Sequence, residues 1–88
     1  AKAPAYMRSA AEKGIPGAQN RLAHMHLEGV RVAKDAVEAV KWRTLAKSNG
    51  IADDALDTAL AKLPKEQRTK GETAAAEWSD KAQVLPNP

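Results

Sequence analysis

The chain has 88 residues and a net charge of +3, with 14 lysines and arginines set against 11 aspartates and glutamates. Nineteen of its 38 hydrophobic residues are alanines, whereas leucine, isoleucine and valine together supply 14. Alanine favours helices over strands, so the composition argues against an all-β fold and predicts helices that pack at short distance. The absence of cysteine excludes disulfides and thiolate sites. No apolar run approaches the roughly 20 residues of a membrane span.

Start and stop signals divide the chain into five predicted helices. Prolines suit the first turn of a helix, and glycines suit the residue just after its end. The helices are expected at about residues 4–14, 15–29, 35–49, 53–63 and 64–84. In the last of them, Gly71 is interpreted as a point of close contact with another helix, with a break of the helix there as the alternative.

The segment Asp35-Ala-Val-Glu38 has the spacing of a capping box. In this motif the Asp35 carboxylate accepts an early backbone N–H of the helix, while the Glu38 side chain reaches back to the N–H of Asp35. We expect it to start the third helix.

An internal repeat with a period of 36 residues organises the chain. The pattern Ala-x-x-aromatic-x-x-x-Ala occurs three times in register, and internal repeats of this length are typical of stacked helical arrays. Its positions are Ala3, Tyr6, Ala10, then Ala39, Trp42, Ala46, and then Ala75, Trp78, Ala82. The register predicts one packed aromatic side chain per unit, rather than aromatic rings that stack on nucleobases beside Lys41 and Arg43.

Further segments resemble the Sel1-like repeat family, which is related to tetratricopeptide repeats. They are Ala10-Ala-Glu-Lys-Gly14, Ala18-Gln-Asn-Arg-Leu22, Gly29-Val-Arg-Val-Ala-Lys-Asp35 and Ala39-Val-Lys-Trp42. One copy is covered almost end to end, from about residue 3 to 50, and the second decays after Gly50. The sequence departs from the family pattern at three positions, with Ala23 in place of Gly, His26 in place of Tyr and Arg31 in place of Gly.

The resemblance implies an all-α, right-handed α/α superhelix in a single domain, 1–88, that forms the C-terminal part of a longer protein. Its units would be a first repeat, a degraded second repeat, a half-repeat capping helix and a tail, at residues 3–38, 39–74, 75–84 and 85–88. The register and the resemblance together assign structural roles to Tyr6, Gly14, Leu22, Gly29, Asp35, Trp42, Gly50 and Trp78.

The resemblance also implies a noncatalytic scaffold or adaptor that binds another protein or an extended peptide, with no cofactor. In such solenoids the helix that opens each repeat lines the concave face, which corresponds here to residues 15–28 and 51–62. The outward residues of these helices, which we expect to contact a partner, are Asn20, His24, Leu27, Asp54, Asp57 and Ala61. Many family members are bacterial envelope or secreted adaptors, which favours a periplasmic or secreted location over the cytoplasm.

Three other functions have less support in the sequence. Nucleic-acid binding would rest on a mildly basic surface, and its affinity would fall steeply with salt. A metal site is disfavoured because His24 and His26 point about 200° apart on a helix. Catalysis is disfavoured because no nucleophile motif surrounds Ser9, Ser48 or Ser79. The pair Asp53 and Asp54 is interpreted as the acidic residues that favour the start of a helix. The chain could also be an accessory repeat domain of a larger signalling or cell-envelope protein.

Overall fold

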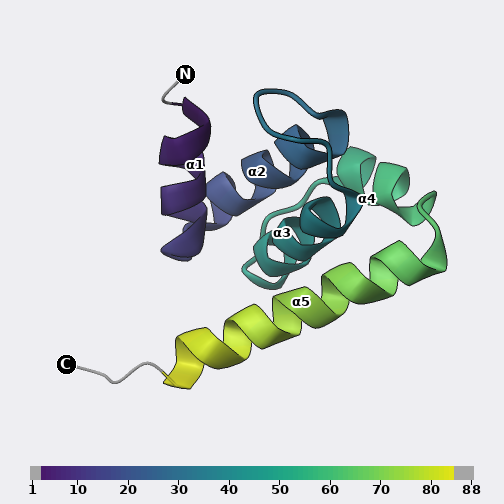
Figure 1. Ribbon diagram of the computed structural model, residues 1–88. Helices are drawn as coiled ribbons and strands as arrows, with labels where there is room; N and C mark the ends of the chain where they lie inside the picture. The colour runs from purple at the N-terminus through teal and green to yellow at the C-terminus, as the bar shows by residue number, and fades with distance from the viewer. Residues whose placement is uncertain (1–2, 85–88) are drawn as a thin grey trace.

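The computed structural model describes residues 3–84, with side chains from 5 to 81, and all regular secondary structure in this part of the chain is α-helix. Five helices follow one another without a strand between them (Figure 1). They are α1 (Ala3–Glu12), α2 (Pro16–Glu28), α3 (Ala36–Ser48), α4 (Asp54–Ala61) and α5 (Lys65–Val84). The predicted number and order of helices are therefore confirmed.

The helix boundaries follow from local chemistry. Pro16 occupies the first turn of α2, and Gly29 ends that helix in the left-handed conformation at φ 72°. Asp35 caps α3 by accepting the backbone N–H of Glu38 at 3.1 Å. The second half of the expected capping box does not form, because the Asp35 N–H donates to the carbonyl of His26 instead.

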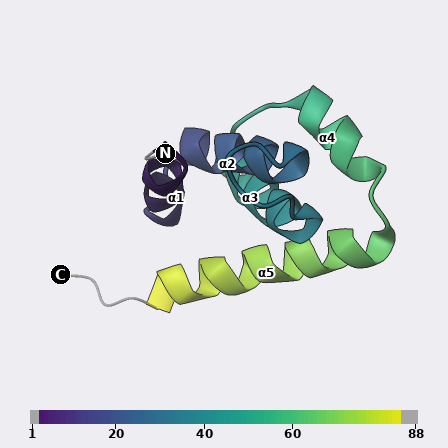
Figure 2. The same cartoon turned by 45° about the horizontal axis from the view of Figure 1, so that its top comes forward.

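Helix α3 lies at the centre of the fold. Helices α2 and α5 make their most extensive contacts with it, and α1 packs on α2. The long α5 runs beneath α3, while α4 stands off to one side and touches α3 lightly (Figures 1 and 2).

The core is built from alanines around a few large side chains. Six alanines are buried with Leu22, Trp42, Leu45 and Leu56; they are Ala11, Ala18, Ala23, Ala39, Ala46 and Ala75. Trp42 is 1% exposed, and its ring meets the half-buried ring of Trp78 edge to face at 6.0 Å between centroids. Small residues thus let the helices approach, and the aromatic pair fills the gap between α3 and α5.

At Gly71 the backbone of α5 lies close against α3. A Cβ built at this position would lie 2.4 Å from Cβ of Val40 and 2.9 Å from the carbonyl oxygen of Val37. Helix α5 runs through Gly71 without a break. The glycine therefore serves as a contact point, and the alternative of a split helix is wrong.

The expected packing of Tyr6 is wrong. Its side chain is 79% exposed on α1, although it occupies the same register position as Trp42 and Trp78. Each of those tryptophans lies against the other, on helices that pack together. Within residues 3–84 no helix comes before α1 to cover Tyr6 in the same way.

Candidate functional site

A buried arginine connects three helices. The Arg43 side chain on α3 is only 4% exposed. Its Nε and Nη2 donate to the two carboxylate oxygens of Asp57 at 2.7 and 3.2 Å. Its Nη1 donates to Oδ1 of Asn20 at 2.8 Å and to the carbonyl of Ile51 at 2.9 Å. The guanidinium thus ties α3 to α2, to α4 and to the segment that leads into α4.

Asp53 extends this network toward α2. As the cap of α4, it accepts the backbone N–H of Leu56 at 3.0 Å. The same carboxylate accepts Nδ2 of Asn20 at 2.9 Å and Nε2 of His24 at 2.7 Å. We call Asn20, His24, Arg43, Asp53 and Asp57 the polar network.

The charges of the polar network stabilise one another. Hydrogen bonds from Asn20, His24 and the Leu56 N–H hold the pKa of Asp53 well below its usual range. The Arg43 guanidinium lowers the pKa of Asp57, and Asp57 in turn raises the pKa of Arg43. Both carboxylates and the guanidinium are therefore charged at neutral pH. The network ties α4 to α2 and α3, in addition to the burial of Leu56 and Leu60 from the same helix.

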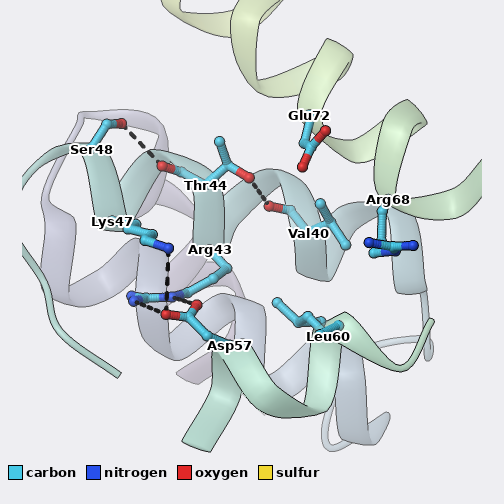
Figure 3. Close-up of a pocket in the computed structure, with 10 residues that line it drawn as sticks. Val40, Arg43, Thr44, Lys47, Ser48, Asp57, Leu60, Arg68 and Glu72 are labelled. Carbon is cyan, nitrogen blue, oxygen red and sulfur yellow. Dashed lines mark hydrogen bonds and ion pairs between the residues drawn. The ribbon is translucent and has the colours of Figure 1, made fainter. Parts of the chain in front are cut away.

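A hollow of about 460 Å³ lies beside the polar network, between α3, α4 and α5 (Figure 3). We call it the α3–α5 groove. Its lining mixes apolar, hydroxyl and charged side chains, namely Val40, Arg43, Thr44, Lys47, Ser48, Asp57, Leu60, Ala61, Arg68 and Glu72.

Several polar groups of the α3–α5 groove already make hydrogen bonds or ion pairs within the protein. Thr44 donates its hydroxyl to the carbonyl of Val40, and Arg68 donates Nε to the carbonyl of Leu63. Lys47 is largely exposed and lies 3.7 Å from Asp57. Figure 3 places Arg43, Lys47 and Asp57 at one end of the groove and Arg68 and Glu72 at the other. Between these ends lie the buried side chains of Val40 and Leu60, so the apolar part of the lining is flanked by charged groups.

The six residues expected on the concave face have different surroundings. Asn20, His24 and Asp57 belong to the polar network, in which Asn20 and His24 donate to Asp53 while Asn20 and Asp57 accept from Arg43. Asp57 and Ala61 line the groove, whereas Asp54 is exposed in the first turn of α4. Leu27 is partly buried against the core.

Sequence reasoning missed Arg43 as the centre of the site. A signal was present, because Arg43 shares one helical stripe with Ala39 and Ala46, at spacings of four and three residues. Both alanines are fully buried. A charge within a buried stripe requires a partner of opposite charge, which here is Asp57.

The residues given structural roles have local explanations. Leu22 and Trp42 are buried, and Trp78 is partly buried against the core. Gly14 and Gly50 have positive φ values of 89° and 91° between helices, as does Gly29 after α2. Asp35 caps α3.

The two histidines have separate environments. His26 is buried, donating Nδ1–H to the carbonyl of Ala33 and accepting Nη2 of Arg8 at Nε2. His24 contacts Asp53 in the polar network. Among the residues that the structure describes, no group of three His, Asp or Glu side chains could hold a metal ion.

The two basic residues next to Trp42 already contact other side chains of the protein. The Lys41 ammonium lies 4.5 Å from the centre of the Trp42 ring, and Arg43 is paired with Asp57. Neither these residues nor the buried Trp42 ring forms an open platform for a nucleobase.

Comparison with known proteins gives no match to a family model, a curated protein or a solved structure. None of the helices within residues 3–84 combines the length and the apolar character needed to cross a membrane.

Proposed function

We propose that this protein is a noncatalytic scaffold that binds a segment of another protein or an extended peptide in the α3–α5 groove. The observation that carries the proposal is a hollow of about 460 Å³ whose lining combines the buried apolar side chains of Val40 and Leu60 with the exposed charges of Lys47 and Glu72. Peptide-binding grooves combine apolar contact with a few polar groups that set orientation. Here Lys47, Arg68 and Glu72 would supply those groups.

The polar network supports this proposal by holding the groove open. The hydrogen bonds of Arg43 to Asp57 join α3 to α4, and the bond from Asn20 to Asp53 joins α2 to the start of α4, beside the buried side chains of Leu56 and Leu60. A groove that is already formed costs less conformational entropy on binding. In this proposal Asn20, His24 and Asp53 position α4, while Lys47 and Ala61 face the peptide.

The proposal includes the repeat architecture. The 36-residue register, the cap at Asp35 and the alanine-rich contacts between helices support a Sel1-like, right-handed superhelical array in which α5 covers the end. The groove then lies on the side where α4 faces α5.

A peptide-display selection tests the proposed function. Random peptides selected on the native protein would be compared on two variants that add the same bulk at exposed alanines. Ala61→Trp fills the groove, whereas Ala5→Trp places the ring on α1, which contributes no residue to the groove lining. We expect selected peptides to bind the Ala5→Trp variant as they bind the native protein, and to lose at least tenfold in affinity for the Ala61→Trp variant.

Two outcomes would contradict the groove as the binding site. One is a selection that yields no peptide above background. The other is a set of peptides that binds both variants equally. Unchanged circular dichroism and Tm in both variants would show that the loss of binding is local.

A further inference from the structure

A second hollow, of about 260 Å³, lies on the opposite part of the fold and is lined by α1, α2 and the segment after α2. We call it the arginine hollow. Its lining consists of Met7, Arg21, Met25, Val30 and Arg31. It shares no lining residue with the α3–α5 groove.

The charged side chains of this lining are all positive. Both charged side chains are arginines, and no carboxylate lines the hollow. Among the residues that the structure describes, neither Arg21 nor Arg31 forms an ion pair. The remaining surface is apolar, with the two methionines partly buried and Val30 half exposed. The hollow therefore complements a ligand that joins carboxylates to apolar side chains.

The backbone at Arg31 gives a second, independent observation. Arg31 has φ 66°, the only positive φ at a non-glycine residue in the described chain. This left-handed conformation is unfavourable for a residue with a Cβ, and glycine would adopt it freely. Strained residues of this kind concentrate at functional sites, where the side chain has a use that offsets its cost to stability. In this structure the Arg31 side chain lines the hollow and makes no ion pair.

We infer that the arginine hollow is a docking site for an acidic, apolar segment of a partner protein. An aliphatic side chain of that segment packs on Met7, Met25 and Val30, and flanking aspartates or glutamates pair with Arg21 and Arg31. Guanidinium groups bind carboxylates through paired, charge-assisted hydrogen bonds. The methionine side chains adapt their shape to the apolar residue that enters.

A peptide fits this hollow better than a nucleic acid does. Phosphate backbones are held by many cations spread along a groove, because each contact releases one counterion. Here two arginines flank a floor of aliphatic and thioether groups, which suits a side chain such as leucine.

The experiment uses methyl NMR, because the only two methionines in the sequence, Met7 and Met25, both line the hollow. The probes are synthetic peptides of glutamate and leucine, one alternating and one with the two residues at helical spacing. The full chain carries ¹³C-methyl methionine, and Met7→Leu assigns the signals. We expect at least one peptide to shift both methyl signals, and its glutamine counterpart to shift neither.

Three variants test the arginines. Arg21→Gln and Arg31→Gly should each weaken peptide binding about tenfold, the effect of losing one charge-assisted contact. Arg31→Gly should also raise Tm by about 4 °C, since it removes the strained φ. Lys34→Gln, an exposed cation in the same segment that does not line the hollow, should leave binding unchanged.

The inference is overturned if neither peptide shifts the methyl signals at millimolar concentration, or if both arginine variants bind as the native protein does. It is also overturned if an oligonucleotide shifts the same signals at lower concentration than the peptides. Because Ala61→Trp lies outside this hollow, it should leave the methyl titration unchanged, so failure of one site is distinguishable from failure of the other.

Discussion

Arg43 and Asp57 pair through both carboxylate oxygens, with Nε–Oδ1 and Nη2–Oδ2 distances of 2.7 and 3.2 Å, and this pair connects α3 to α4. The arginine is almost completely buried, while the aspartate side chain is 31% exposed. Removing the carboxylate would leave a buried cation with only neutral partners, Asn20 and the carbonyl of Ile51. The pair therefore behaves as a unit whose members depend on each other.

We predict that Asp57→Asn lowers the free energy of unfolding by about 2–3 kcal/mol, because it leaves the buried guanidinium without a negatively charged partner. The double variant Arg43→Met, Asp57→Asn should be less destabilised than Asp57→Asn alone, since methionine fills the space without a charge. Urea unfolding measures both. Asp54→Asn, which changes the exposed aspartate of the same helical turn, is the matched control and should cost well under 1 kcal/mol. Equal losses for Asp54→Asn and Asp57→Asn would contradict the role of the pair.

Acid should unfold the protein partly through Asp53. Its pKa is lower in the folded protein than the value of about 3.9 in an unfolded chain, so the charged form stabilises the fold. That contribution is fully present above about pH 4 and is lost as the pH falls through the folded pKa. Asp53→Asn keeps a residue able to cap α4 but loses the charge.

For Asp53→Asn we expect a loss of about 2 kcal/mol at neutral pH that shrinks steadily below about pH 4, where the native protein is losing the same contribution. Urea unfolding from pH 7 to pH 2 measures the difference. A loss that stays constant across this range would mean that the charge of Asp53 does not contribute to stability.

The helices could be predicted from the sequence because their ends depend on neighbouring residues. Pro16, Gly29 and Asp35 act within a turn of their own positions, and each marks a boundary in the structure. The second half of the capping box does not form because both of its groups have other partners. The Asp35 N–H donates to the carbonyl of His26, and the Glu38 carboxylate accepts Nε1 of Trp42 at 3.3 Å and lies 3.8 Å from Lys41.

The site depends on contacts that the sequence does not display. Asn20 and Asp53 are 33 residues apart, and only the packing of α2 beside the start of α4 brings them together. Tyr6 illustrates the same limit. The repeat register gives it the position of Trp42, but burial depends on whether a neighbouring helix covers that position.

Gly71→Ala should destabilise the protein, although alanine is the better helix former. The added Cβ would meet Cβ of Val40 at 2.4 Å and the carbonyl oxygen of Val37 at 2.9 Å, so α5 must move away from α3. We expect a net loss of about 1–2 kcal/mol, because overpacking outweighs a helix-propensity gain of about 1 kcal/mol. Gly17→Ala on α2, where a Cβ meets nothing within 4 Å, is the control and should be neutral or stabilising. A gain in Tm for both variants would show that α5 does not need this close approach.

The three aromatic residues of the repeat register should rank by burial in their effect on stability. Trp42→Ala should cost about 3–5 kcal/mol, because it removes a buried ring and leaves a cavity between α2, α3 and α5. Trp78→Ala should cost about 1–3 kcal/mol, since the ring is partly exposed but contributes an edge-to-face contact worth about 0.5–1.5 kcal/mol. Tyr6→Ala should cost less than 0.5 kcal/mol at this exposed position. Urea unfolding, monitored by circular dichroism, ranks the three variants. This signal does not depend on tryptophan fluorescence, which the two tryptophan variants change. If Tyr6→Ala were as costly as Trp78→Ala, Tyr6 would have to be covered in solution, and the exposed face of α1 would then be an interface.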